Sequence, residues 1–280
     1  KEFNEKALLP YLIFLSPTLK ETFFKGVFTL PPASISIFRD NAIETNIYWD
    51  IVFEETDITL EQATSEIDRI VGESIANKTK YFNNKEMIGQ SLSGGVDSSY
   101  LAARFRPKKT FTVGYNDKEF SEIDNAKALS DIIGAEHISE VIDSDKSLTE
   151  LERIVYLCDM PFANLSAIPM YYLSKRVSEH THAVLSGEGA DEFFGGYHEY
   201  TDPKYMNIYK VLPEFVRKAI GNRMLKNDKD FKGKNFLIKG LPTEDWYIGQ
   251  AKIFHENEAI NVLKPEYTKG PKVQDIIKPY

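Results

Sequence analysis

Two glycine-rich loops hold the residues of this sequence that are best suited to chemistry. The first loop runs from Ser93 to Ser99 and reads SGGVDSS. Glycines let the backbone turn tightly and approach a ligand closely, and unpaired N–H groups at the start of a helix attract anions. We therefore expect a phosphate or pyrophosphate site here, with hydroxyl donors on Ser93, Ser98 and Ser99.

Asp97 distinguishes this first loop from a plain phosphate cradle. A carboxylate beside phosphate oxygens is repulsive unless a cation lies between them, and Mg²⁺ prefers oxygen ligands. The loop has no Gly-Lys-Ser/Thr sequence, so it is not a Walker-type P-loop. The alternative interpretation is an ordinary glycine turn in which Asp97 is an acid at the start of a helix.

The second loop runs from Ser186 to Tyr197 and reads SGEGADEFFGGY. Its acids Glu188, Asp191 and Glu192 repel one another unless a cation or a proton is present. Glu192 stands where the GxGxxG dinucleotide fingerprint needs its third glycine, which makes a dinucleotide site a weak interpretation. The alternative for this loop alone is the solvated start of a helix.

Strands and helices alternate around both loops, which predicts an α/β fold. The repeated β-α-β order is typical of a doubly wound, mainly parallel sheet with helices on both faces. Ligands bind such sheets at the carboxyl ends of strands, so both loops should face one crevice. The expected strands are Met87–Leu92, Lys109–Tyr115, His137–Ile142 and Ala183–Leu185, the last of them buried, and the expected helices are Val96–Phe105, Ser121–Ile133, Leu148–Leu157 and Ile168–Glu179.

The N-terminal part of the chain has a different pattern and is expected to form strands and loops. Residues Ser34–Phe38 alternate polar and apolar as a half-buried strand does, and Asp40-Asn41 is a plausible turn before Ile43–Trp49. Two or three strands cannot bury a core alone, so this short β segment should be the edge of something larger. A capping box at Thr59–Gln62 then predicts a helix start.

Composition and charge exclude several classes of protein. The chain has 280 residues and is 42% hydrophobic, which is incompatible with wholesale disorder. Its 34 basic and 42 acidic residues give a net charge of −8, so a nucleic-acid partner is not expected. No apolar stretch is long enough to span a bilayer, so no membrane partner is expected either. The single cysteine, Cys158, is expected in the core and favours a reducing cytoplasm.

The two loops together resemble a known family. SGGVDSS resembles the PP-loop of the N-type ATP pyrophosphatases, and alone it would also suit GMP synthetase, NAD synthetase or tRNA thiolation enzymes. LSGEGADEFFGGY is more specific and resembles the synthetase domain of glutamine-dependent asparagine synthetases. The segments TFTVGY, FSEIDNAKALSDIIGAEH and DMPFANLSAIPMYYLSK agree with that resemblance. It implies the fold of the PP-loop ATP pyrophosphatases, which is also described as adenine nucleotide α-hydrolase-like.

The resemblance implies a site for ATP and Mg²⁺ with a role for each matching residue. Glu188 would be catalytic, supporting both formation of β-aspartyl-AMP and the attack of ammonia, and Asp97 and Asp191 would ligate Mg²⁺. The nucleotide would be bound by Leu92, Val113 and Gly114 around the adenine, by Ser93, Gly94, Gly95, Asp97, Ser98 and Ser99 around the phosphates, and by Ser186 and Gly187.

The resemblance also implies a function and a division of the chain. The reaction would convert aspartate to asparagine with release of AMP and pyrophosphate, using ammonia from glutamine. Residues 1–55 would be a remnant of the N-terminal Ntn-type glutaminase domain, and residues 56–280 a synthetase domain that is C-terminally incomplete. The N-terminal cysteine nucleophile and the lysine-bearing C-terminal segment have no match here. We therefore expect a truncated chain, inactive as it stands, whose glutaminase domain is missing, with a homodimer as a candidate assembly.

Two alternative functions stay open at this point. The first is an adenylating relative of the β-lactam synthetase or peptide cyclase type, which acts on another carboxylate. β-Lactam synthetases have a tyrosine at the position of Glu188, so the glutamate favours asparagine chemistry. The second is a non-catalytic nucleotide-binding domain, against which the presence of Asp97, Glu188 and Asp191 argues.

Overall fold

The structure is a computed structural model that describes residues 2–117, 121–161, 164–227, 231–246 and 254–277. The chain divides into two compact units. The sheet unit comprises Glu54–Asp159 and Leu165–Tyr200, and the second unit comprises Lys1–Phe53, Met160–Asn164 and Thr201–Tyr280. Both glycine-rich loops lie in the sheet unit.

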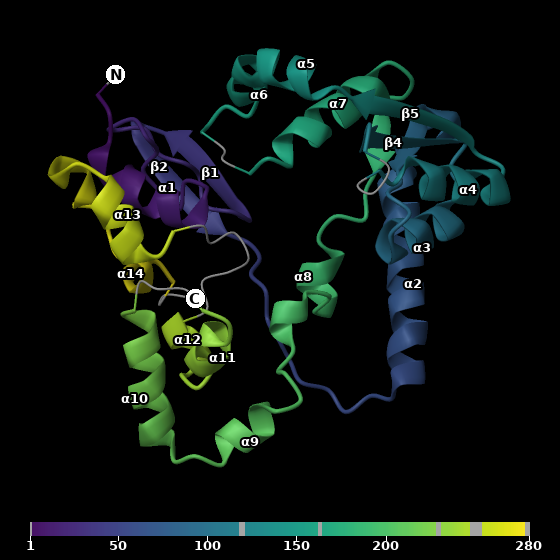
Figure 1. The fold of residues 1–280 in the computed structure, drawn as a ribbon. Coiled ribbons are helices and arrows are strands. Elements are labelled where there is room, and N and C mark those ends of the chain that lie inside the picture. The colour runs from purple at the N-terminus through teal and green to yellow at the C-terminus, as the bar shows by residue number, and fades with distance from the viewer. Residues whose placement is uncertain (1, 118–120, 162–163, 228–230, 247–253, 278–280) are drawn as a thin grey trace. The chain divides into compact units, whose positions relative to one another are not determined.

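A parallel four-stranded sheet is the framework of the sheet unit (Figure 1). Its strands lie in the order β5-β4-β3-β6. The chain therefore moves outward from β3 through β4 to β5 and then returns to β6 on the other side of β3. The topological switch point lies between β3 and β6, the two strands that precede the glycine-rich loops. The strand bounds are β3 Ile88–Ser91, β4 Lys109–Tyr115, β5 Glu136–Ile142 and β6 Ala183–Leu185.

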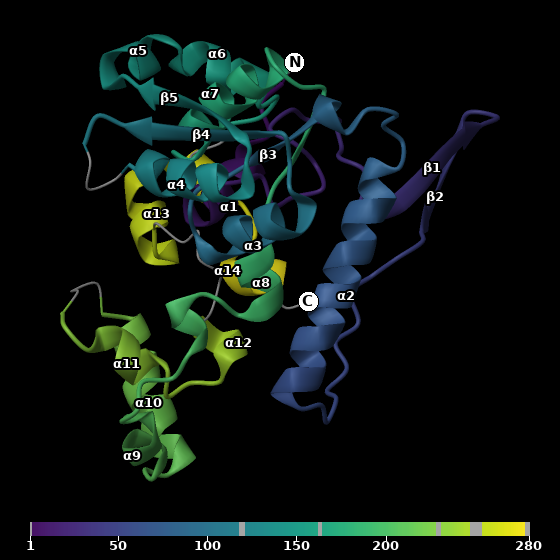
Figure 2. The same ribbon diagram turned by 90° about the vertical axis from the view of Figure 1, so that its right-hand side faces the viewer.

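Helices cover both faces of this sheet, which confirms the predicted fold class. Helices α3 (Val96–Phe105) and α4 (Ile123–Ile133) lie on one face and α7 (Ala167–Ser178) on the other, as Figures 1 and 2 show together. Helix α2 (Leu60–Thr79) packs beside α3. Leu92, Ala102 and Ala126 form a buried cluster beneath α3 and α4, and Leu129 and Ile133 of α4 pack against it.

Local sequence signals account for the ends of these helices. The side chain of Thr59 accepts a hydrogen bond from Gln62 N–H and the Gln62 side chain accepts one from Thr59 N–H, which confirms the capping box of α2. Gly134 ends α4 in the left-handed conformation at φ +74°, a geometry that glycine adopts without steric cost. The shorter elements of this unit are η2 Lys85–Met87, α5 Ser144–Thr149, α6 Leu151–Leu157, α8 Ala190–Phe194 and η3 His198–Tyr200.

Three expectations about the sheet unit are wrong in detail. The helix expected at Leu148–Leu157 is two helices, because α5 ends at Thr149 and α6 begins at Leu151. The strand Ala183–Leu185 is not buried on both faces, because β6 is an edge strand and Val184 is 38% exposed. Cys158 lies at the C-cap of α6 and is only partly buried.

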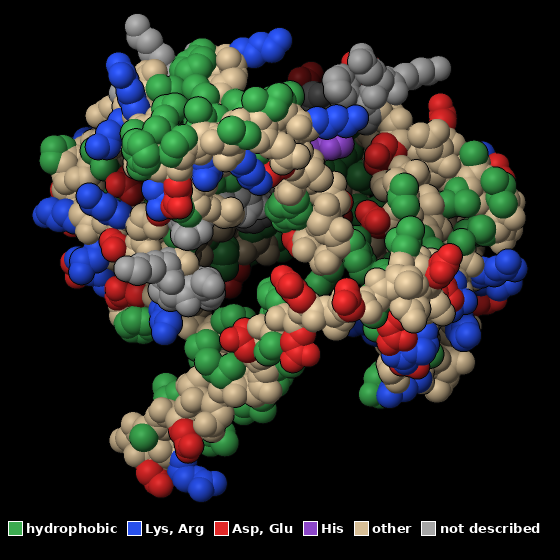
Figure 3. Space-filling view, turned by 90° about the horizontal axis from the view of Figure 1, so that it is seen from below, with side chains coloured by type: hydrophobic (Ala, Val, Ile, Leu, Met, Phe, Trp, Pro, Cys, Tyr) green, Lys and Arg blue, Asp and Glu red, His purple; other side chains and the backbone are tan. Residues whose placement is uncertain are grey.

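The second unit contains the N-terminal β segment. Strands β1 (Ser34–Arg39) and β2 (Ala42–Ile47) form an antiparallel hairpin, which ends two residues short of the predicted Trp49. Asp40 and Asn41 form its turn at φ +51° and +59°, a conformation that Asp and Asn tolerate better than most residues. In Figure 3 the hairpin is the narrow arm with green hydrophobic side chains along its length.

The second unit also corrects the expectation that the N-terminal residues form only strands and loops. Leu8–Phe14 is a helix, α1, whose Pro10 lies in the first turn, where proline removes no helical hydrogen bond. Leu9 and Ile13 of α1 form a buried cluster with Ala259 and Val273. The remaining helices are η1 Glu5–Ala7, α9 Met206–Lys210, α10 Glu214–Leu225, α11 Lys234–Ile238, α12 Thr243–Trp246, α13 Glu256–Val262, η4 Pro265–Thr268 and α14 Val273–Ile277. Within the described residues, no helix is long and apolar enough to cross a membrane.

Candidate active site

A cavity of about 570 Å³ opens at the carboxyl ends of the strands, and residues of the sheet unit line it. Both glycine-rich loops contribute to its wall, which confirms that they face one crevice. A volume of this size suits a ligand as large as a nucleotide. The site therefore lies where strand order alone predicted it, at the switch point between β3 and β6.

The first loop is closed on itself by a set of serine hydrogen bonds. Ser93 N–H donates to Ser98 Oγ at 3.2 Å, and the two serine hydroxyls lie 2.9 Å apart. Gly95 N–H donates to Ser93 Oγ at 3.2 Å, and Ser98 Oγ donates to the Gly95 carbonyl at 3.2 Å. Gly94 turns the chain at φ +81°. These bonds fix the loop against the first turn of α3 and leave Asp97 exposed there.

The second loop touches the first one backbone to backbone. A Cβ atom added to Gly187 would lie 3.2 Å from Ser98 N and 3.3 Å from Asp97 C. Residue 187 is therefore glycine because the two loops approach so closely. Glu188 follows with its N–H donating to Ser186 Oγ at 3.2 Å, and its own side chain is exposed to the cavity.

The far part of the second loop places three more polar side chains on the cavity. Asp191 and Glu192 lie in the first turn of α8, and Tyr197 follows the helix. Tyr197 Oη donates to Glu192 Oε1 at 2.8 Å. This hydrogen bond, together with partial burial, raises the pKa of Tyr197 to about 12. Tyr197 is therefore a protonated donor at neutral pH and holds Glu192 in place.

The charged side chains among the described lining residues are all acidic. Among the described lining residues there are five carboxylates and no lysine, arginine or histidine, the acids being Asp97, Glu122, Glu188, Asp191 and Glu192. An anionic ligand such as a nucleoside triphosphate would meet net repulsion from these side chains unless cations accompany it. Helix α3 offsets part of that repulsion, because its N-terminus faces the cavity.

The donor set around Asp97 and Asp191 fits Mg²⁺ that arrives with a nucleotide. In the described ranges, no three His, Cys, Asp or Glu residues converge as a ready metal site. Mg²⁺ is commonly held by one or two carboxylates together with substrate phosphates and water. Asp97 and Asp191 supply two such carboxylates from the first turns of α3 and α8, and both line the cavity.

Most residues named from the sequence line the cavity, and three do not. Gly94 makes the turn beneath the lining, and Ser99 N–H donates to the Gly95 carbonyl at 3.0 Å. Gly114 is buried, and a Cβ there would lie 2.5 Å from Ser121 Oγ. These three residues are therefore not part of the lining. The lining residues are Leu92, Ser93, Gly95, Asp97, Ser98, Val113, Ser186, Gly187, Glu188 and Asp191.

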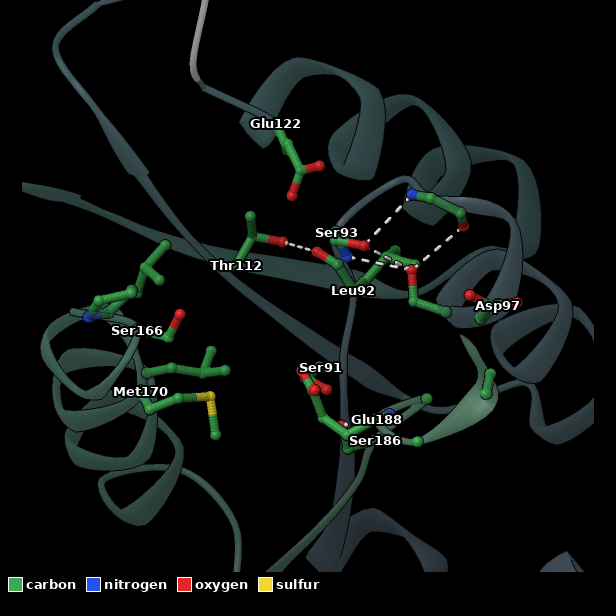
Figure 4. A pocket seen from close by; sticks show the side chains of 18 of the residues that line it. Ser91, Leu92, Ser93, Asp97, Thr112, Glu122, Ser166, Met170, Ser186 and Glu188 are labelled. Atoms are coloured by element: carbon green, nitrogen blue, oxygen red, sulfur yellow. Dashed lines mark hydrogen bonds between the residues drawn. The ribbon is translucent and has the colours of Figure 1, made fainter. Parts of the chain in front are cut away.

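The wall opposite the second loop was missed by reasoning from the sequence. In Figure 4, Ser166 and Met170 of the α7 segment face the cavity across from Ser186 and Glu188, and Glu122 lies above Thr112. The spacing of Ser166, Met170 and Leu173 gives one helical face, so the periodicity of α7 could have identified this wall. Glu122, just before α4, carried no comparable signal.

The fold and the cavity define a doubly wound α/β domain whose ligand site is built from two acidic glycine loops. Residues 73–259 match the family model described as asparagine synthase, which is more than half of the chain. The chain therefore belongs to the asparagine synthase family.

Individual comparisons agree with this family. The chain is 33% identical over 285 residues to the glutamine-hydrolyzing asparagine synthetase 1 of Bacillus subtilis, covering 100% of this chain and 44% of the relative. A provisionally named glutamine-hydrolyzing asparagine synthetase of Mycobacterium tuberculosis is 32% identical over 277 residues, covering 95% of this chain and 42% of that protein. The chain thus spans less than half the length of these relatives.

Among solved structures, the NH3-dependent NAD synthetase of Campylobacter jejuni is similar at 14% sequence identity and a TM-score of 0.34, covering 77% of this chain and 93% of that one. That similarity is too low to carry the fold assignment, which rests on strand order and on the helices covering both faces of the sheet.

Proposed function

We propose that the cavity binds Mg-ATP and activates a carboxylate by adenylation, and that the intact protein converts aspartate to asparagine with release of AMP and pyrophosphate. One observation carries the proposal. Two acidic glycine loops meet at Ser98 and Gly187 on a single cavity, in a chain of the asparagine synthase family. Glutamine would be the source of ammonia.

The first loop would bind the phosphates of ATP. The N-terminus of α3 and the hydroxyl of Ser93 provide hydrogen-bond donors on one side of the cavity, while the Ser98 hydroxyl already donates to the Gly95 carbonyl. An aspartate carboxylate that attacks the α-phosphorus must approach another anion. Mg²⁺ held by Asp97 and Asp191 would lower that repulsion and stabilise the leaving pyrophosphate.

The second loop would act in the next step. Ammonia adds to the acyl carbon of β-aspartyl-AMP, the nitrogen loses a proton, and AMP leaves with the bonding electrons. Glu188 is a carboxylate on the cavity wall and is suited to accept that proton.

The N-terminal part would belong to a glutaminase domain whose remainder lies outside these 280 residues. Five hydrophobic side chains of the β1–β2 hairpin are at least half exposed, namely Ile35, Ile37, Phe38, Ile43 and Ile47. A two-stranded hairpin with its apolar side chains in water is not a stable unit. The relatives are more than twice as long as this chain, which supports a covering domain. Residues 56–280 would then form the synthetase domain.

The proposed function is tested with the intact protein that carries this chain. Incubation with L-aspartate, glutamine and Mg-ATP should yield asparagine, AMP and pyrophosphate in equal amounts, measured by chromatography. ADP as the product contradicts adenylation. Activity on other carboxylates with aspartate inert would instead support a lactam- or peptide-forming reaction. ATP binding without any pyrophosphate–ATP exchange would support a non-catalytic domain.

A further inference from the structure

Gln90 is a fully buried amide at the centre of the parallel sheet. It lies in β3, paired with Thr110 of β4 and Leu185 of β6, and its exposed fraction is 0%. Its Nε2 donates a hydrogen bond of 2.8 Å to the carbonyl of Ser98. Its Oε1 is also buried, and among the described residues it has no hydrogen-bond partner. Only the nitrogen of the amide therefore has a hydrogen-bond partner among the described residues.

A half-satisfied buried amide is a poor choice for stability. An acceptor that loses water and gains no donor costs folding free energy, whereas an apolar side chain of the same length would fill the space without that cost. Methionine matches glutamine closely in length and volume. Packing of the sheet therefore gives no reason for an amide at position 90.

The hydrogen bond from Gln90 to Ser98 gives a reason for an amide at this position. The Ser98 hydroxyl closes the first loop through Ser93 and Gly95, and the Ser98 backbone nitrogen lies under Gly187 of the second loop. Ser98 is 8% exposed and joins both loops to the start of α3. Gln90 reaches this residue from behind, through the Ser98 carbonyl, and so connects β3 directly to the meeting point of the loops.

We propose that Gln90 is a positioning residue for the nucleotide site, which sets the place of the first loop and of the N-terminus of α3 through the Ser98 carbonyl. This inference rests on the proposed function, because it assigns the first loop to phosphate binding. Gln90 itself does not line the cavity and does not touch the ligand. Its effect should therefore appear in nucleotide affinity rather than in the chemical step.

The test is Gln90→Met in the intact protein, assayed by pyrophosphate–ATP exchange and by thermal unfolding. The hydrogen bond to Ser98 is lost, so the KM for Mg-ATP should rise about threefold to tenfold, which is the effect of one buried hydrogen bond. The kcat should stay within about twofold, because Glu188 and its loop keep their places. The Tm should be unchanged or higher, because the unsatisfied amide oxygen is gone.

A matched control lies on the neighbouring strand. Thr110 is paired with Gln90 in register and is equally buried, but its hydroxyl bonds to Ser130 of α4 at 2.7 Å, away from the loops. Thr110→Val should lower the Tm and leave the KM for Mg-ATP unchanged. Opposite responses of the two variants would support positioning by Gln90.

Three results would overturn the inference. The first is an unchanged KM for Mg-ATP in Gln90→Met. The second is a fall in Tm that accompanies the rise in KM, as expected for a side chain that only packs. The third is failure to fold of both Gln90→Met and Gln90→Leu, because the amide would then hold the core rather than the loop. Failure of the proposed function is separate, since it would appear as absence of Mg-ATP binding by the wild-type protein.

Discussion

The two glycine-rich loops of the cavity are built in opposite ways. The first is fixed by Ser93, Ser98 and Gly95 through four hydrogen-bonding contacts, and Gln90 holds it from the sheet. In the second loop Glu188 and Glu192 are exposed and Asp191 is half-buried, and the Glu188 side chain makes no hydrogen bond within the described residues. The first loop is therefore preorganised, whereas the second loop places the unconstrained Glu188 side chain on the cavity.

This difference separates binding from chemistry. A phosphate cradle gains affinity from donors that are already in place before the ligand arrives. A proton acceptor must instead reach an atom whose position changes during the reaction, so a less constrained side chain such as Glu188 is suitable. Substitutions in the first loop should therefore act on nucleotide affinity, and substitutions in the second loop on turnover.

The largest effect is expected at Glu188. Glu188→Gln removes the proton acceptor and keeps the side chain's size, so kcat for asparagine formation should fall at least about 100-fold. The KM for Mg-ATP should stay within about twofold, because the first loop is intact. Steady-state kinetics of the intact protein measure both values. A loss of nucleotide affinity equal to the loss of turnover would break the division between the loops.

The next effect is expected where the loops touch. Gly187→Ala places a Cβ about as close as real contacts allow to Ser98 N, and Gly187→Val adds two more carbon atoms. Overpacking of this kind costs about 1–3 kcal/mol, which corresponds to a fall of about fivefold to 150-fold in kcat/KM. Valine should be worse than alanine, and both KM and kcat should change. If both variants had the kcat/KM of the wild-type protein, the close approach of the two loops would be dispensable.

A smaller effect is expected at Ser98. Ser98→Ala removes the hydroxyl that closes the first loop, so the KM for Mg-ATP should rise about threefold to tenfold with little change in kcat. Ser130→Ala is the control, because that buried serine of α4 bonds to Thr110 of β4 and does not contact the first loop through this bond. The control should lower the Tm only. A kcat effect at Ser98 larger than its KM effect would contradict the preorganised cradle.

The smallest effect concerns stability outside both loops. Burial lowers the pKa of His137, Lys127 lowers it further and Asp131 opposes the shift, while the hydroxyls of Thr110 and Ser130 face its Nδ1. Because the folded-state pKa is lowered, the unfolded chain binds the proton more readily and stability falls as the pH drops from 7 to 5. His137→Gln should reduce that fall by less than about 1.4 kcal/mol in urea unfolding. A larger fall in stability between pH 7 and pH 5 in the variant than in the wild type would contradict a lowered pKa of His137.

The sequence was most informative where structure is local. Val96–Phe105 and Lys109–Tyr115 have the predicted bounds, because the hydrophobic pattern decides both elements and Gly95 precedes the helix. The two loops could be placed on one crevice because parallel strands bring their carboxyl ends to the same edge. The functional roles of Glu188, Asp97 and Asp191 stay predictions.

Features that depend on distant contacts could not be predicted in the same way. The exposure of Val184 follows from the place of β6 at the sheet edge, which no local pattern encodes. Helix α1 is stabilised by α13 and α14, which come more than 240 residues later. The bond from Gln90 to Ser98 depends on how α3 packs on β3. The sequence pattern therefore identified Gln90 only as a residue of a strand.

Transfer of an oxygen atom from substrate to nucleotide is the most direct test of adenylation at this cavity. L-Aspartate labelled with ¹⁸O in its β-carboxylate is incubated with the intact protein, glutamine and Mg-ATP, and the products are examined by mass spectrometry. Attack of the carboxylate on the α-phosphorus leaves one ¹⁸O in AMP, and Glu188→Gln should slow its appearance. Label in inorganic phosphate together with ADP, and none in AMP, would contradict an acyl-adenylate.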